Sequence, residues 1–109
     1  MARSEFSERI VELIKAIPPG KIATYGGIAA AAGNPRAART VVWLLNSIGR
    51  SRDEVLPWHR VINSKGTISL KPGEGYELQR ALLESEGVEF DKKGHVEFER
   101  FEWSYRSKR

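Results

Sequence analysis

The stretch that decides the fold is TYGGIAAAAGNPRAARTVVWLLNS, residues 24–47. Thr24 can cap a short helix with its side chain, and Gly33 can close that helix. Pro35 is suited to the first turn of a second helix, which we expect over residues 36–47. Two helices joined by a tight Gly-Asn-Pro turn have the layout of a helix-turn-helix, although many other helix pairs share it.

Apolar residues cover much of the second helix and predict that it is largely buried: Val41, Val42, Leu44 and Leu45. The polar exceptions are Arg36, Arg39 and Asn46. An arginine in the first turn of a helix opposes the helix dipole. It is also well placed to point away from the protein into a nucleic acid.

The N-terminal flank, residues 4–17, has apolar residues at helical spacing, with Ser4 or alternatively Ser7 as N-cap. IPPGK ends this helix because proline cannot continue it. Residues 48–56 form a polar loop, and Ser64-Lys65-Gly66 is expected to be a turn. Together with the short elements of the C-terminal half, these segments predict a mainly α fold with small β elements.

The C-terminal half alternates short elements with glycine turns. Thr67–Leu70 alternates like a strand, and KPGEG at 71–75 is a flexible loop. A helix is expected over residues 76–86, closed by Gly87, with its leucines inward: Leu78, Leu82 and Leu83. Residues 88–109 are interpreted as a hairpin around the turn DKKG, followed by a tail. The whole chain, 1–109, is expected to be one domain.

Composition narrows the function classes. The chain has 109 residues, no cysteine and a formal charge of +4, with a pI near 9.6. Without cysteine there is no disulfide, thiolate metal site or thiol nucleophile. A basic protein of this size has nucleic acid as a natural partner, although +4 could also serve solubility. We expect no metal, no membrane association and, from the absence of a signal-like apolar block, a cytoplasmic location.

The segment LPWHRVIN, residues 56–63, places an aromatic ring beside cationic groups, with the lysine of a nearby loop further along the chain. This is what a base-binding pocket needs, because the ring stacks on a base while cations meet phosphates or base oxygens. The structural alternative is that Trp58 is an ordinary core residue. Tyr25 could likewise be a buried helix-start aromatic, and Arg39 a solvated surface arginine.

Four ordered segments resemble the DNA-binding domain of O6-alkylguanine-DNA alkyltransferases. They are IPPGKIATYGGIAAAAG (17–33), NPRAART (34–40), PWHRVINSKGTIS (57–69) and ALLESEG (81–87), and the resemblance covers about residues 5–90. The active-site signature of that family, Pro-Cys-His-Arg-Val, reads Pro57-Trp58-His59-Arg60-Val61 here. The chain therefore looks like the alkyltransferase-like branch, which has Trp at the cysteine position.

The resemblance implies a helix-turn-helix, winged-helix-like domain that binds the minor groove, flips O6-alkylguanine outward and marks it for nucleotide excision repair. It implies no enzyme activity and no cofactor. Arg39 takes the place of the finger that fills the space left by the base, and Tyr25 that of a tyrosine crowding the 3′ phosphate. His59 and Glu86 match the pair that activates the thiolate in the alkyltransferases. Lys71 aligns roughly with a basic residue that senses the alkylated guanine edge in some relatives.

Carried over residue by residue, the resemblance predicts two sets of contacts. The predicted lesion pocket consists of Tyr25, Trp58, His59, Arg60, Val61, Asn63, Lys71 and Glu86. The predicted DNA contacts are Thr24, Tyr25, Arg36, Ala38, Arg39, Thr40 and Lys65. The implied partners are double-stranded DNA containing O6-alkylguanine and nucleotide excision repair proteins, and the implied state is a monomer. A eukaryotic protein would be nuclear, and a bacterial one nucleoid-associated.

The recognition helix departs from the family, which usually has small residues where Val42 and Trp43 stand. Their bulk either alters how the helix enters the groove or packs inward, since Trp43 has apolar neighbours on both sides. Two other function classes stay open. One is a sequence-specific transcription regulator that reads the major groove, usually as a dimer. The other is a hydrolase in which His59 and Glu86 activate water.

Overall fold

The structure, a computed structural model, describes residues 4–48 and 55–104. The helices are α1 (Glu5–Ala16), α2 (Tyr25–Ala31), α3 (Ala38–Ile48), α4 (Tyr76–Ser85) and α5 (Phe98–Phe101), with a 3-10 turn η1 (Trp58–Arg60). Two short strands, β1 (Ala23–Thr24) and β2 (Val61–Ile62), pair in parallel. The prediction of a mainly α fold with small β elements is therefore confirmed.

The first two helices begin where their caps predict. The Ser4 hydroxyl accepts a hydrogen bond from the backbone N–H of Ser7 at 3.1 Å, and α1 starts one residue after Ser4. The Thr24 hydroxyl accepts from the N–H of Gly27 at 2.9 Å at the start of α2. Each cap satisfies a backbone donor that the first helical turn leaves unpaired.

Helix α3 begins at Ala38, two residues later than expected, because Pro35 and Arg36 belong to the turn. The side-chain oxygen of Asn34 accepts from the N–H of Arg36 at 3.0 Å, and its backbone carbonyl accepts from the N–H of Ala37 at 3.1 Å. An asparagine that bonds the backbone two residues on fixes a turn in place of a helix start. The helix-turn-helix layout itself is present.

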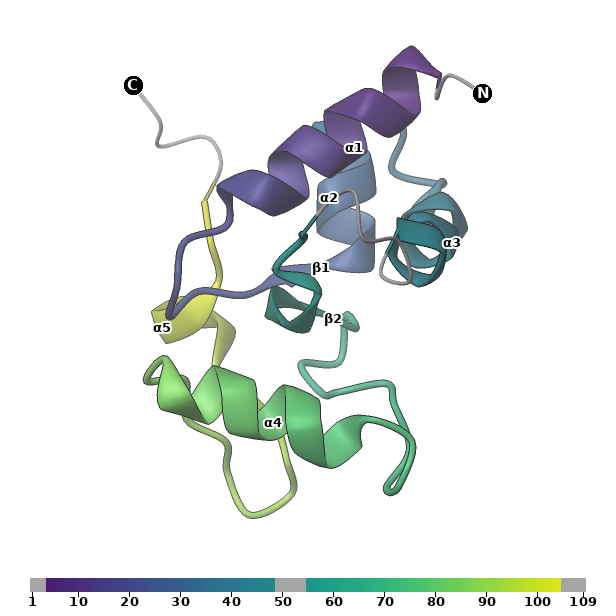
Figure 1. Cartoon of the computed structure of the whole chain (residues 1–109). Coiled ribbons are helices and arrows are strands. Elements are labelled where there is room, and N and C mark those ends of the chain that lie inside the picture. Colours follow the sequence, from purple (N-terminus) through teal and green to yellow (C-terminus); the bar gives the residue numbers. More distant parts are fainter. Residues whose placement is uncertain (1–3, 49–54, 105–109) are drawn as a thin grey trace.

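The small parallel sheet separates two apolar clusters. Ala23 and Val61 pack with α1, α2 and α3, whereas Ile22 and Ile62 pack with α4 and the C-terminal segment. Successive residues of an extended chain face opposite sides, so Ala23 and the preceding Ile22 pack in different clusters, as do Val61 and Ile62 of β2. Figure 1 shows α1, α2 and α3 on one side of this sheet and α4 on the other.

The C-terminal segment ties both clusters together. The N–H of Ile22 donates to the carbonyl of Phe101 at 2.8 Å, and the N–H of Trp103 donates to the carbonyl of Ile22 at 2.7 Å. Trp103 is 8% exposed and packs in the α1–α2–α3 cluster. Residues near the end of the chain therefore complete a core built mainly from its first half.

The strand expected over Thr67–Leu70 is absent. The side chain of Asn63 organises this segment as a turn, with its oxygen accepting from the N–H groups of Lys65 (3.0 Å) and Thr67 (3.1 Å). Its amide donates to the Thr67 hydroxyl at 2.8 Å. These local bonds hold Thr67 in the turn, so the alternating pattern was a wrong guide here.

The C-terminal hairpin was predicted correctly only at its tip. An isolated antiparallel bridge joins Phe90 to Val96 around the expected turn at residues 91–94. Beyond it, residues Phe98–Phe101 form α5 and not a strand. Phe98 and Phe101 are three apart, a spacing that fits one helical turn as well as it fits loose alternation. Residues 105–109 of the predicted tail lie outside the described residues, as do residues 49–54 of the predicted polar loop.

Helix α4 occupies its expected position but presents a different face to the core. Leu83 is fully buried, whereas Leu78 is 57% exposed, so the expectation that Leu78 points inward is wrong. Gln79 takes the buried position and is 3% exposed. Its side-chain N–H groups donate to the carbonyls of His59 (3.0 Å) and Val61 (3.1 Å). A buried amide is tolerated here because both of its N–H bonds are made.

None of the helices in the described part of the chain has the length and apolar character to cross a membrane. No group of three or more histidine, aspartate or glutamate side chains among residues 4–48 and 55–104 is arranged to hold a metal ion.

Candidate nucleic-acid interface

The outer face of α3 carries the exposed side chains of the helix-turn-helix. Arg39, Val42, Trp43 and Asn46 lie on it, at the helical spacing i, i+3, i+4 and i+7. The opposite face is buried through Val41, Leu44 and Ile48. This helical phase turns Trp43 outward, where it is 63% exposed, so the interpretation that Trp43 packs inward is wrong.

The predicted DNA contacts differ in how exposed their side chains are. Arg36 and Arg39 are exposed, and α3 has no acidic residue in its first turn. Ala38 and Thr40 are half-buried, and the Thr24 hydroxyl is engaged in capping α2. The positive charge of this surface is therefore carried by the two arginines, next to the exposed apolar side chain of Trp43.

A pocket of about 450 Å³ opens beside the outer face of α3. Its walls come from α2, α3, η1 with β2, the loop before α4, and α4 itself. The lining residues are Tyr25, Val42, Leu45, Asn46, Trp58, Val61, Leu70, Glu74, Gly75 and Gln79. Val42 and Asn46 belong both to the pocket and to the outer face of α3, so the two surfaces are continuous.

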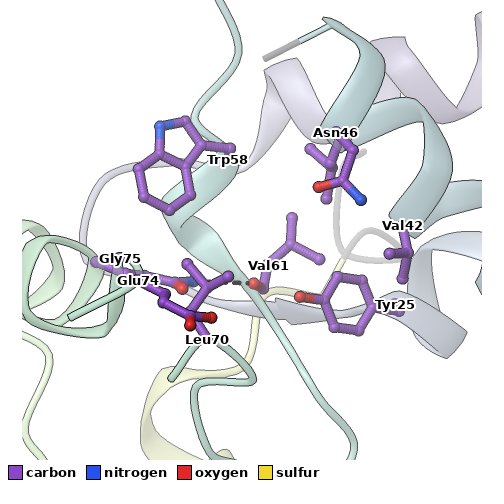
Figure 2. A pocket seen from close by; sticks show the side chains of 10 residues that line it. Tyr25, Val42, Asn46, Trp58, Val61, Leu70, Glu74 and Gly75 are labelled. Carbon is purple, nitrogen blue, oxygen red and sulfur yellow. Dashed lines mark hydrogen bonds between the residues drawn. The ribbon is translucent and has the colours of Figure 1, made fainter. Parts of the chain in front are cut away.

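Two aromatic side chains stand in different walls of this pocket. Figure 2 shows Trp58 on the η1 side and Tyr25 near α3, with Val61 between them and Leu70, Glu74 and Gly75 along the loop. Aromatic rings give a sequence-tolerant stacking surface for a base. The volume lies in the range of small-molecule sites, which suits a single nucleobase better than an extended chain.

A cluster around Glu86 fixes the backbone that carries Trp58. The Glu86 carboxylate accepts from Arg60 Nη2 at 2.7 Å and Nε at 3.0 Å, and from the N–H of Gly20 at 3.2 Å. Arg60 Nη1 also donates to the carbonyl of Ile17 at 2.9 Å. These bonds join η1 to the end of α4 and to the turn after α1. They therefore hold in place the short 3-10 turn to which Trp58 belongs.

His59 completes the same cluster. Its Nε2 lies 2.9 Å from Glu86 Oε2, and its ring meets that of Trp58 edge-on, with centroids 6.0 Å apart. The Arg60 guanidinium, with help from His59 and the N–H of Gly20, lowers the pKa of Glu86 to about 2. An ionised carboxylate can only accept hydrogen bonds, so His59 Nε2 carries a hydrogen and donates a hydrogen bond to Glu86. Neither His59 nor Glu86 lines the pocket.

The structure thus distributes the eight residues of the predicted lesion pocket over four places. Tyr25, Trp58 and Val61 line the pocket, while His59, Arg60 and Glu86 form the cluster that supports η1. Asn63 organises the following turn, which also holds the predicted DNA contact Lys65, and Lys71 lies exposed on the loop before α4. Neither Asn63 nor Lys71 belongs to the pocket lining.

Sequence reasoning missed most of the other lining residues. The apolar pattern of the second helix predicts burial for Val42 and Leu45, but Val42 is 38% exposed and Leu45 is half-buried, and both line the pocket. The sequence pattern gives no role to Glu74 or Gln79. A glutamine in the apolar face of a helix is the signal that could have found Gln79, because a buried amide needs specific partners. Glu74 gives no such signal, since a glutamate in a glycine-rich loop is ordinary.

Comparisons with known proteins identify the family. Residues 5–88 match the family model of the 6-O-methylguanine DNA methyltransferase, DNA binding domain. The chain belongs to this family. Among its relatives is a DNA base-flipping protein of Escherichia coli strain K12, 42% identical over 100 residues that cover 92% of this chain and 75% of the relative. The alkyltransferase-like protein 1 of Schizosaccharomyces pombe is 41% identical and is covered over 82% of each chain.

Solved structures of family members share the fold. S. pombe Atl1 in complex with damaged DNA containing O6-carboxymethylguanine superposes with a TM-score of 0.77 at 36% identity, covering 95% of this chain and 99% of that chain. Mycobacterium tuberculosis OGT in complex with DNA superposes with a TM-score of 0.61 at 34% identity. This chain spans about half of that methyltransferase, 51% of its length, and corresponds to its DNA-binding part.

Proposed function

We propose that this protein binds double-stranded DNA containing O6-alkylguanine, rotates the damaged nucleotide into the pocket and holds it there without repairing it. The observation that carries the proposal is the continuity of the two surfaces. The outer face of α3 presents Arg36 and Arg39, and the same helix supplies Val42 and Asn46 to a pocket with aromatic walls. The DNA base-flipping protein and Atl1, as relatives, support this function.

The energetics of base flipping fit this arrangement. Extruding a base costs a few kcal/mol, and less where its pairing is already weak. Alkylation at O6 removes the N1 proton of guanine and weakens its pairing with cytosine. Insertion of Arg39 into the vacated space, together with stacking against Trp58, offsets the remaining cost. The exposed Trp43, four residues beyond Arg39, adds an apolar surface that can lie against the sugar edges of the groove.

Binding without repair follows from the chemistry of the chain. The chain has no cysteine, and Trp58 stands at the position where the resemblance places the reactive thiol. An indole ring offers no comparable nucleophile, so the alkyl group stays on the base. The cluster of His59 and Glu86 gives a hydrolase no support, because neither residue lines the pocket and Glu86 is paired with Arg60.

The bound state has a use only if another system acts on it. A protein that distorts the duplex around a lesion and remains bound marks that lesion, and we propose that nucleotide excision repair reads the mark. The pocket and the arginine surface both lie within one chain, so a monomer suffices for binding. The protein would act wherever the genome is held, in the nucleoid of a bacterium or the nucleus of a eukaryote.

The decisive measurement is affinity for a duplex with one O6-methylguanine against the same duplex with guanine. We expect the lesion to bind about tenfold more tightly or better, because its flipping cost is lower. Arg39→Ala should lower lesion affinity by about tenfold, since the space left by the base is then unfilled. Lys15→Ala, on α1, removes one positive charge from a different surface and serves as the control.

Equal affinities for the two duplexes at several salt concentrations would count against lesion recognition. An Arg39→Ala variant that binds the lesion as well as the parent would show that another residue fills the gap. A loss of the same size in the Lys15→Ala control would mean that Arg39 contributes only general charge.

Absence of alkyl transfer is tested with a duplex that carries a labelled methyl group on guanine O6. After prolonged incubation with excess protein, we expect all label to remain with the DNA and the mass of the chain to be unchanged. Label on the protein, or release of labelled methanol, would contradict the proposed non-enzymatic role.

A further inference from the structure

The pocket has an acidic residue in its wall. Among the described residues that line it, Glu74 is the one carboxylate and there is no lysine, arginine or histidine; the others are apolar, aromatic, amide or glycine. Figure 2 shows Glu74 with Leu70 and Gly75 on the loop side of the pocket, across from the α3 residues. A negative charge is unexpected in a site for DNA, whose backbone is itself negative.

The loop holds Glu74 against the pocket through local bonds. The N–H of Glu74 donates to the carbonyl of Lys71 at 2.9 Å, and the N–H of Gly73 donates to the Glu77 carboxylate at 3.0 Å. Gly75 has a φ of 117°, and a Cβ there would lie 2.8 Å from Leu70 Cδ1. The loop is therefore packed closely on Leu70, and its turn fixes where the Glu74 side chain begins.

The charge of Glu74 is not neutralised within the described chain. Its carboxylate has no hydrogen bond or ion pair among residues 4–48 and 55–104, in contrast to Glu86 with Arg60 and Glu84 with Arg80. It therefore remains available to a molecule in the pocket.

The neighbouring Gln79 adds a second hydrogen-bond acceptor to the same side of the pocket. Both of its amide N–H bonds go to backbone carbonyls, those of His59 and Val61. The side-chain oxygen is then the group that Gln79 can offer to a ligand, and oxygen only accepts. The loop and α4 side of the pocket thus presents hydrogen-bond acceptors, one of them negatively charged.

This chemistry suits one class of adduct and opposes another. The exocyclic amino group of guanine is a donor and can bond to such acceptors. An anionic substituent brings a second negative charge toward Glu74 and is repelled. S. pombe Atl1 has been solved in complex with damaged DNA containing O6-carboxymethylguanine, which carries an anionic substituent.

We infer that Glu74 makes this pocket select neutral O6-alkyl groups over anionic ones. The inference rests on the proposed function, because it concerns which lesions the same pocket accepts. Glu74 would act as a specificity residue by direct electrostatic contact with the adduct or the base edge.

The test compares O6-carboxymethylguanine with the neutral O6-(2-hydroxyethyl)guanine, which is similar in size, in otherwise identical duplexes. Glu74 is solvent-exposed, and an exposed charge contributes at most about 1 kcal/mol, so we expect the parent to bind the neutral adduct about fivefold more tightly at low salt. Glu74→Gln should reduce this ratio to about twofold or less. Glu84→Gln, the same change at an exposed site on α4 that does not line the pocket, should keep the parent ratio.

The possible outcomes separate the two proposals. If all O6-alkyl duplexes bind better than guanine but the ratio is near one in the parent, or survives in Glu74→Gln, the Glu74 inference is overturned and lesion recognition stands. If no O6-alkyl duplex binds better than guanine, lesion recognition fails and the selectivity of Glu74 fails with it. An equal fall of the ratio in Glu84→Gln would assign the effect to net charge and also overturn the inference.

Discussion

Replacing Glu86 with alanine is expected to lower the free energy of unfolding by about 3 kcal/mol at pH 7, measured by urea denaturation. The carboxylate accepts from Arg60, His59 and the backbone of Gly20, and its side chain is 16% exposed. Removing it leaves the mostly buried guanidinium of Arg60 without its partner, which is the costly way to break an ion pair. The cluster also joins α4 to η1, so the loss should reach the wall that carries Trp58.

The matched control is Glu84→Ala, two residues earlier in the chain. Glu84 pairs with Arg80 at the surface, with side-chain exposures of 50% and 32%. A pair of this kind contributes about 0.5 kcal/mol or less. Similar losses in both variants would show that the Glu86 cluster is no more important than a surface ion pair.

Lowering the pH should remove the stabilisation that the Glu86 cluster provides. The pKa of Glu86 is about 2 in the folded chain, mainly because of Arg60, against an ordinary value of 4.5. Protons therefore bind more readily to the unfolded chain, and this stabilisation is complete above about pH 5 and lost as the pH falls from 4.5 toward 2. The stability gap between parent and Glu86→Ala should narrow over that range, and a constant gap would contradict this assignment.

Replacing Trp58 with alanine is expected to weaken binding to an O6-methylguanine duplex by about 30-fold, or about 2 kcal/mol. Trp58 is partly exposed in the pocket wall, and loss of its ring removes the stacking surface offered to the flipped base. Trp58→Phe keeps an aromatic face and should lose less. Affinity for the unmodified duplex should change little in either variant, because that complex depends on the arginine surface.

Denaturation of the same variants decides between the two interpretations of Trp58. A pocket residue should cost little stability when truncated, whereas a core tryptophan would cost about 3–5 kcal/mol. A large loss of stability together with an unchanged preference for the lesion would show that Trp58 is a core residue and not a pocket residue. Trp103, which is 8% exposed, shows what a core tryptophan looks like in this chain.

The sequence alone determined the features that depend on near neighbours. The N-caps of α1 and α2 are bonds between residues three apart, Ser4 with Ser7 and Thr24 with Gly27, so the local pattern suffices to predict them. The turn at 91–94 and the tight connection of α2 to α3 are local in the same way. The family was also readable, because its motifs are ordered along the chain.

The tertiary structure decided the features that join distant segments. Glu86 meets Gly20 across 66 residues, and the parallel pairing of β1 with β2 joins Ala23 to Val61. No periodicity in either segment reveals its partner, so the two-residue strands were not predicted. The burial of Gln79 depends in the same way on the carbonyls of η1 and β2.

Two features of the candidate site depend on packing that the sequence does not show: the exposure of Trp43 and the presence of Glu74 in the pocket wall. Apolarity predicts that a side chain will be buried on average, but the phase of a packed helix decides which face is buried. Val41 and Leu44 take the inner face of α3, and Trp43 is left outside with 63% exposure. Glu74 reaches the pocket only because its loop folds over Leu70. The sequence thus determined α1 to α4 and the family, and packing decided which side chains face the pocket.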